Sequence, residues 1–228
     1  MILGVDDLEF LLQLSQRAGL LALEMQASVA PCEKPDGTIV TEADLQVEKL
    51  LRHGLRRRFP EMPVLGEEEG CVGETSQLLF ALDPIDGTVS YARGDPLWSV
   101  SVGVLREGRP IAGCVVAPAL GMAWWGREGQ GAYRAGQHLQ RGPTRLGRNS
   151  LLAMTTTALR RYGTPPRSLG HVRSLGSIAL QLVACAEEHV DVALTTNWSV
   201  WDLAAGLAIL AEAGGRTVTV DGVEIVDL

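Results

Sequence analysis

Acidic residues at four places in the sequence have the types and spacing of a metal site. The densest group is the run 83–88 (DPIDGT), and the others are Asp44, Glu67 within the run 66–70, and Asp202. Two carboxylates held about 4 Å apart repel each other by about 4 kcal/mol at an effective dielectric of 20, and a bound cation relieves that repulsion. Oxygen ligands of this kind favour Mg²⁺ or Mn²⁺. The residues therefore point to a site for a divalent cation.

These acidic positions also have structural interpretations. Two carboxylates stand three residues after a hydroxyl side chain, which is the spacing of a helix capping box: Asp44 after Thr41, and Asp202 after Ser199. Glu67 lies in a run that could form a solvated turn. Taken one at a time, short patterns of this kind favour the structural interpretation over the functional one.

The run 83–88 gives the metal interpretation its main support, although Asp-Gly is also a common turn dipeptide. It follows the apolar segment 78–82, so its carboxylates would stand at the carboxyl end of a strand, where ligand sites of α/β proteins lie. Pro84 restricts the backbone between the two aspartates and holds both side chains near one point. Gly87 admits a phosphate close to the backbone, and a helix beginning near Thr88 would direct free N–H groups at that phosphate.

The elements that must position these residues follow from hydrophobic periodicity. A period near 3.6 predicts helices over residues 6–27, 41–58, 177–188 and 200–213. Short apolar runs predict strands at 63–65, 78–82, 99–105, 110–117, 122–125, 132–134, 150–154 and 190–194, with a terminal pair around Asp221-Gly222. We expect loops at 31–37 and 164–167. The order predicts an antiparallel meander in a mixed α/β (α+β) protein whose helices pack on sheets.

Composition limits the partners of the chain. Its 228 residues carry a formal net charge of −7, which disfavours nucleic acid and anionic membranes as partners. The four cysteines form no C-x-x-C pair, so neither a zinc site nor a disulfide framework is expected. The first ten residues lack the basic start and apolar run of a signal peptide, and we expect a cytoplasmic protein. P-loop and G-x-S-x-G patterns are absent from the sequence.

Five segments in the same order resemble the inositol monophosphatase family, within the lithium-sensitive phosphatases. They are Lys34 with 40–44, 66–68, 83–88, 173–177, and 201–206 followed by 212–215. The resemblance covers nearly the whole chain. It implies a layered α-β-α-β-α sandwich forming one catalytic domain over residues 1–228. Within it, an N-terminal lobe (1–147) would carry most metal ligands, and a C-terminal lobe (148–228) would supply Asp202 and substrate contacts.

The resemblance also implies an activity, which is Mg²⁺-dependent hydrolysis of a small phosphomonoester by a metal-activated water. Two or three Mg²⁺ would bind per site, with Mn²⁺ as a possible substitute. The implied ligands are Glu67, Asp83 and the backbone carbonyl of Ile85 for the first metal, and Asp83, Asp86 and Asp202 for the second. Asp44 would support a looser third metal through water, and Thr88 and Glu67 would position and deprotonate the attacking water. A homodimer is also implied.

The substrate stays open at this point. The implied substrate contacts are Asp86, Gly87, Thr88, Gly176, Ser177, Thr195 and Asp202. Inositol-specific members usually carry a glutamate where this chain has Thr195, which argues against myo-inositol phosphate. An inositol-1-phosphate-like ester is therefore kept as one candidate beside other sugar or polyol phosphates. The alternatives are 3′-phosphoadenosine 5′-phosphate, fructose 1,6-bisphosphate and histidinol phosphate. Outside catalysis, the acidic residues are also compatible with a binding protein or a simple calcium binder.

Overall fold

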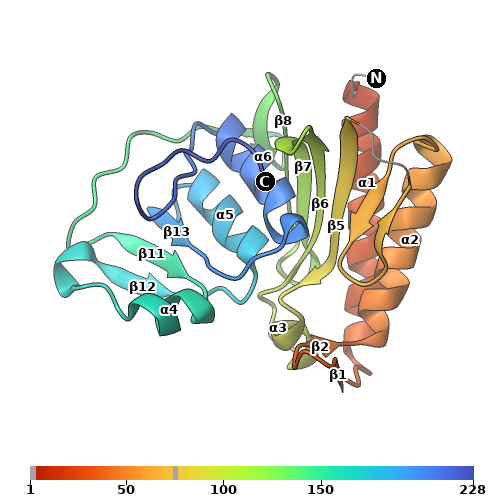
Figure 1. Cartoon of the computed structure of the whole chain (residues 1–228), viewed down its shortest axis with the longest axis horizontal. Coiled ribbons are helices and arrows are strands. Elements are labelled where there is room, and N and C mark those ends of the chain that lie inside the picture. The colour runs from red at the N-terminus through yellow and green to blue at the C-terminus, as the bar shows by residue number, and fades with distance from the viewer. Residues whose placement is uncertain (1–3, 74–76) are drawn as a thin grey trace.

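Two long helices pack side by side and cover one face of a large sheet (Figure 1). They are α1 (Val5–Gln26) and α2 (Glu42–Arg58), as the sequence predicts, and the computed structural model describes residues 4–73 and 77–228 of the chain. Buried side chains recur every three or four residues along α1, from Leu8 through Leu11 to Leu14. That spacing gives each helix one apolar stripe, and the stripe faces the sheet.

The large sheet has eight strands in the order β10-β9-β8-β7-β6-β5-β3-β4. Its strands are β3 (Val64–Gly66), β4 (Gly70–Val72), β5 (Leu78–Asp86), β6 (Ser99–Arg106), β7 (Arg109–Ala117), β8 (Met122–Arg127), β9 (Gly131–Arg134) and β10 (Gln137–Leu139). Neighbours from β5 to β10 pair antiparallel in chain order, and β3 pairs with β5 in parallel. The predicted antiparallel meander is therefore confirmed.

A second, smaller sheet lies beyond the two helices that cover the other face of the large one (Figure 1). It is parallel, with the order β12-β11-β13. Its strands are β11 (Leu151–Met154), β12 (His171–Arg173) and β13 (Val192–Leu194), and the two helices are α5 (Ile178–Ala186) and α6 (Val200–Glu212). A short helix, α4 (Thr156–Tyr162), lies beside the small sheet, on the side away from α5 and α6. The expected α-β-α-β-α layering is confirmed.

The central helices α5 and α6 are apolar almost all round because they lie between two sheets. In α6 every residue from 203 to 210 is buried. A helix that is apolar on all faces is a core element, whereas α1 and α2 keep a solvent face. Along the described residues, no helix combines the length and the apolarity needed to cross a membrane.

The structure departs from the sequence-based expectations at short elements. The expected loop at 31–37 contains one strand of a small hairpin, β1 (Cys32–Glu33) with β2 (Ile39–Val40). The strand expected at 78–82 continues to Asp86. Four further elements were not predicted: β4, β10, β12 and α4. The terminal strand pair is reduced to one isolated bridge between Val218 and Glu224. Strands of two or three residues are too short to show a period in sequence.

Candidate active site

Asp83 and Asp86 point to one side of β5 because the strand is bulged between them. Asp83 is opposite Ser101 and Asp86 is opposite Ser99, with a register shift in between. Residues three apart on a regular strand face opposite sides, but one extra residue on the bulged strand restores the same side. The Asp83 carboxylate accepts a hydrogen bond of 3.0 Å from the Ile85 N–H, which holds the bulge. Both carboxylates are buried.

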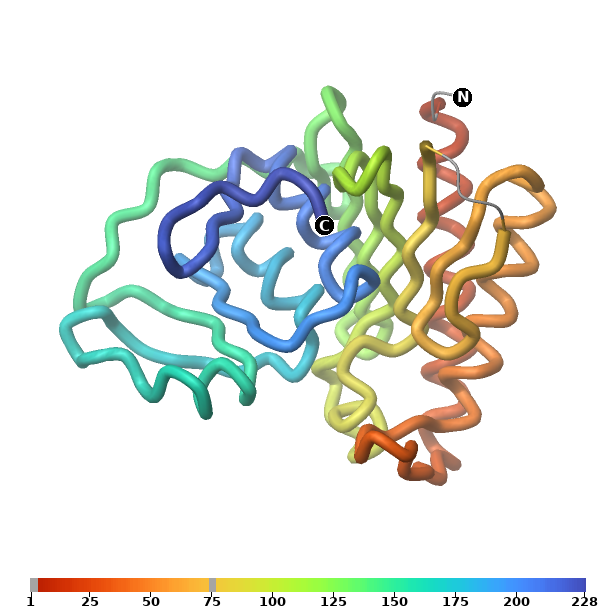
Figure 2. Tube along the Cα trace, in the orientation of Figure 1, coloured from red at the N-terminus to blue at the C-terminus, as the bar shows by residue number. Residues whose placement is uncertain are grey.

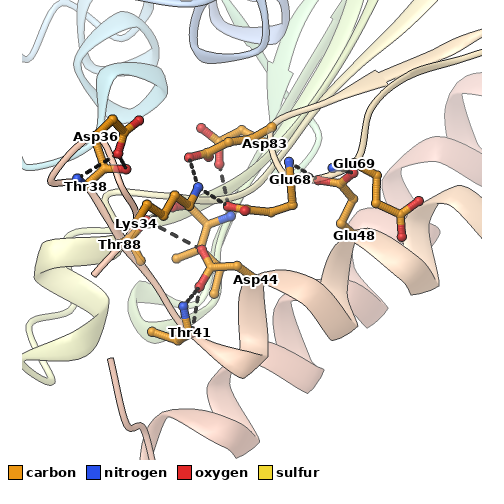
Figure 3. A network of polar contacts seen from close by, with 12 residues as sticks. Lys34, Asp36, Thr38, Thr41, Asp44, Glu48, Glu68, Glu69, Asp83 and Thr88 are labelled. Atoms are coloured by element: carbon orange, nitrogen blue, oxygen red, sulfur yellow. Dashed lines mark hydrogen bonds and ion pairs between the residues drawn. The ribbon is translucent and has the colours of Figure 1, made fainter. Parts of the chain in front are cut away.

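Asp44 serves as a helix cap and as a site residue at the same time. Its Oδ2 accepts hydrogen bonds from the Thr41 N–H (2.8 Å) and hydroxyl (2.6 Å), the capping box that the spacing predicts. Its Oδ1 is 3.5 Å from the Thr88 hydroxyl, which also lies 3.1 Å from the carbonyl oxygen of Ile85 (Figure 3). The two interpretations of Asp44 therefore coexist, one on each carboxylate oxygen.

Asp202 reaches the same place from the first turn of α6. Its Oδ2 accepts the Ser199 N–H at 2.8 Å, which completes a second capping box. The helix lies against β6 and β7 at two glycines, since a Cβ on Gly103 or Gly113 would collide with Ala204 or Ala205 of α6. This close approach of helix and sheet sets the depth at which Asp202 enters the site.

Asp86 connects strand β5 of the large sheet to the start of helix α5. Its carboxylate accepts hydrogen bonds from the Ser177 hydroxyl (2.5 Å) and from the backbone N–H groups of Ile178 (3.1 Å) and Ala179 (2.6 Å). A carboxylate at a helix N-terminus is stabilised by the free N–H groups and by the helix dipole. Ser177 is fully buried, and its hydroxyl also lies 3.0 Å from that of Ser99.

Glu67 lies in the turn between β3 and β4, opposite Lys34. The Lys34 Nζ is 3.2 Å from Glu67 Oε1 and 2.7 Å from Glu68 Oε1. Lys34 follows β1, and Figure 3 shows its side chain reaching into the space between Asp44, Asp83 and Glu68. Burial and these two carboxylates act on Lys34 in opposite directions, and its pKa is raised. Its ammonium group balances at most one of the negative charges gathered here.

Five carboxylates thus meet in one place, here called the carboxylate site: Asp44, Glu67, Asp83, Asp86 and Asp202. Burial is the main reason that every one of their pKa values is raised, to about 7 for Glu67 and Asp86 and to about 6 for Asp44 and Asp202. The pKa of Asp83 lies well above its usual range, because of burial and then the charges of the other four members. Carboxylates that lie this close resist ionisation unless a cation joins them.

A family model for the inositol monophosphatase family matches residues 7–226. The chain belongs to the inositol monophosphatase family. It is 37% identical to the histidinol-phosphatase of Mycobacterium tuberculosis over 96% of this chain and 89% of that protein. It is 29% identical to inositol monophosphatase 1 of Sus scrofa, over 95% and 84% of the two chains.

Solved structures of the family have the same fold. The inositol monophosphatase of Thermotoga maritima superposes with a TM-score of 0.87 at 30% identity, covering 97% of this chain and 88% of the other. The enzyme from Anabaena gives 0.83 at 30% identity, over 96% and 86% of the two chains. This family member is accordingly a phosphatase, a phosphomonoester hydrolase that acts on a small phosphate ester.

The donor set of the carboxylate site fits a hard divalent cation. It consists of carboxylate oxygens together with the carbonyl oxygen of Ile85, and these are the ligands that Mg²⁺ and Mn²⁺ prefer. Within residues 4–73 and 77–228, no three His, Cys, Asp or Glu side chains form a finished cage for an ion. The residues that would hold an ion are therefore near one another without forming a closed cage, and Glu67 contacts Lys34.

The expected substrate residues of this family member lie in two places. Gly87 and Gly176 approach each other, since a Cβ on Gly87 would lie 3.3 Å from the Gly176 carbonyl oxygen, and both have a positive φ (98° and 73°). These glycines permit close contact between the run 83–88 and the start of α5. Thr195, just beyond β13, lines a cavity of about 810 Å³ whose lining includes no member of the carboxylate site. Its buried hydroxyl has no hydrogen-bond partner among the residues that the structure describes.

Sequence reasoning missed the charged residues that contact the turn carrying Glu67 without belonging to the carboxylate site. Glu48 and Arg52 of α2 form a buried ion pair of 2.8 Å, and Glu68 pairs with Lys34. The available signal was a pair of opposite charges four residues apart, Glu48 and Arg52, each of which directly follows a residue of the apolar stripe of α2 (Val47 and Leu51).

Proposed function

We propose that the carboxylate site binds two Mg²⁺ ions, with a looser third, and hydrolyses a small phosphomonoester with an activated water. The observation that carries this proposal is the gathering of five mutually repelling, largely buried carboxylates from separate segments of the chain. The proposed ligands are Glu67, Asp83 and the Ile85 carbonyl for one ion, and Asp83, Asp86 and Asp202 for the other. Asp44 supports the third.

When bound, the divalent ions acidify the attacking water and neutralise charge on the phosphoryl and leaving-group oxygens. The residues of the chain do the positioning. Thr88 holds the water with its hydroxyl, which the Ile85 carbonyl and Asp44 Oδ1 already orient. Glu67 accepts the proton that the attacking water gives up. The N–H groups at the start of α3 (Thr88–Ala92), which follows Gly87, would donate to the phosphate oxygens.

The experiment that tests this proposal is a phosphate-release panel with the purified chain. Inositol 1-phosphate, histidinol phosphate, fructose 1,6-bisphosphate and 3′-phosphoadenosine 5′-phosphate are compared with Mg²⁺ and with EDTA. We expect release from at least one ester with Mg²⁺ and none with EDTA. Release that EDTA leaves unchanged would contradict the metal proposal.

Histidinol phosphate is the second candidate substrate. It is favoured by relatives named histidinol-phosphatase from Mycobacterium tuberculosis (37% identical) and Streptomyces coelicolor (34% identical). The ranking of kcat/KM across the panel decides between histidinol phosphate and the polyol phosphates.

Lithium inhibition is a further expected result. Li⁺ is a small hard cation that suits carboxylate oxygens, so it should take one Mg²⁺ position and stop turnover at millimolar concentration. The measurement is the rate of phosphate release against LiCl, with KCl at equal ionic strength as the control. Equal inhibition by the two salts would count against a shared ion position.

The homodimer and the cytoplasmic location follow from the family resemblance and the sequence, and both stay predictions. Light scattering of the purified protein measures the first, and fractionation of cells measures the second.

A further inference from the structure

Three charged residues on α2 lie one turn apart on the face that points to the site. Asp44, Glu48 and Arg52 are spaced i, i+4 and i+8, so they form a row along the helix. Glu48 is 0% exposed and Arg52 is 3% exposed. Burying an ion pair costs several kcal/mol in lost hydration and rarely adds net stability, so such a pair needs another explanation.

Glu48 holds the turn that carries Glu67. Its carboxylate accepts the backbone N–H of Glu68 on Oε2 at 2.9 Å and that of Glu69 on Oε1 at 3.0 Å (Figure 3). The N–H of Glu67 itself bonds to the Leu82 carbonyl at 3.3 Å, beside Asp83 on β5. The three successive N–H groups of the turn are therefore fixed between β5 and α2.

Arg52 holds the two strands that flank this turn. Its Nε donates to Glu48 at 2.8 Å, Nη1 donates to the Val64 carbonyl at 3.0 Å, and Nη2 donates to the Gly70 carbonyl at 2.5 Å. A planar guanidinium with donors on several sides can make these contacts at once, which a lysine cannot. A Cβ on Gly66 would collide with the Glu48 carboxylate and the Arg52 guanidinium, so the ion pair packs directly on the hairpin backbone.

We propose that Glu48 and Arg52 are positioning residues that set the place of Glu67 relative to Asp44 and Asp83, and through it the metal affinity of the site. This inference rests on the proposed metal-dependent function. Neither residue is one of the proposed ligands. Their buried charges fix the backbone of the Glu67 turn to the helix that supplies Asp44, so the two carboxylates keep one spacing. Groups of this kind behind metal ligands typically change affinity by about 10–100-fold when substituted.

The test is the Mn²⁺ affinity of Glu48→Gln, measured by titration calorimetry without substrate. The amide keeps the size of the side chain but removes the charge and turns one acceptor into a donor that faces an N–H group. We expect the Kd for Mn²⁺ to rise about 10-fold or more relative to the unsubstituted chain. Amide hydrogen exchange at Glu68 and Glu69 should accelerate in the same variant.

Glu42→Gln is the matched control, because it makes the same change on the same helix at an exposed position, where the side chain accepts a hydrogen bond from Gln46 one turn away. Its Kd should stay at the value of the unsubstituted chain. Arg52→Lys keeps the charge but cannot span both carbonyls, so it provides a milder second variant if Glu48→Gln folds poorly, and its Kd should also rise.

The outcomes separate the two proposals. A Glu48→Gln variant that melts lower but binds Mn²⁺ as tightly as the unsubstituted chain would reduce the pair to a structural role and overturn the inference alone. No Mn²⁺ binding by the unsubstituted chain would overturn the proposed function, and the inference with it.

Discussion

Asp83→Asn is expected to remove phosphate release almost completely. Asp83 is the proposed ligand of both ions and is the member of the carboxylate site that faces the charges of all four others. The asparagine amide is neutral, so it lacks the negative charge with which the Asp83 carboxylate would offset the two divalent ions. We expect kcat/KM to fall at least ~1,000-fold, which corresponds to about 4 kcal/mol of transition-state stabilisation. The measurement is phosphate release at saturating Mg²⁺ with the best ester of the panel.

The same variant should fold normally, which separates a lost site from a lost fold. The amide oxygen can still accept the Ile85 N–H, and one negative charge leaves a group of carboxylates that repel one another. In metal-free buffer its melting temperature should match or exceed that of the unsubstituted chain. Asp221→Asn, at an exposed turn, is the matched control and should leave both activity and melting unchanged. A large loss of melting temperature in Asp83→Asn would contradict the repulsion argument.

Without metal, the protein is expected to become less stable as the pH rises from about 4 to about 7. The folded pKa values of Glu67 and Asp86 (about 7) and of Asp44 and Asp202 (about 6) exceed the ordinary values of 4.5 and 3.8. Over this window the folded chain keeps protons that the unfolded chain has released. Raising the pH therefore favours the unfolded state, and the free energy of unfolding falls.

The expected loss of stability with rising pH is large for a single site. Each unit of pKa difference is worth about 1.4 kcal/mol, and about 1 kcal/mol moves the melting temperature of a chain this long by about 2–4 °C. We expect a melting temperature in EDTA at least about 5 °C lower at pH 8 than at pH 5. Mg²⁺ at 100-fold above its Kd should raise the free energy of unfolding by about 2.7 kcal/mol at pH 8.

Calorimetry or fluorescence melting at a series of pH values, with EDTA or Mg²⁺, measures this effect. Asp83→Asn serves as an internal control, because it removes one coupled carboxylate and should flatten the pH dependence. A melting temperature in EDTA that rises between pH 5 and pH 8 would show that the carboxylates are already compensated in the folded chain.

Hydrophobic periodicity in the sequence determined the large elements of this fold. The long helices α1 and α2 each bury one apolar stripe at a period near 3.6. Strands β5, β6 and β7 are covered on both faces, so they stand out in the sequence as short continuous apolar runs. β1, β4, β10 and β12 have two or three residues, too few to carry a period, and tertiary pairing alone forms them.

For the site, residue types and spacing predict a cation site at the run 83–88 and single out Asp44, Glu67 and Asp202, and the family resemblance implies the role of each. Spacing alone could not decide whether Asp44 and Asp202 cap helices or face the site. The structure places both in capping boxes and leaves Asp44 Oδ1 3.5 Å from Thr88. A carboxylate has two oxygens, and only three-dimensional surroundings assign each of them.

Apart from the two capping boxes, tertiary structure decided the contacts that orient the buried carboxylates. The bulge turns Asp83 and Asp86 to one side, Asp86 receives the N–H of Ala179 from 93 residues away, and Glu48 receives that of Glu68 from 20 residues away. The physical reason is that a buried carboxylate is oriented by whichever N–H groups lie beside it, and chain folding rather than local sequence brings those groups there.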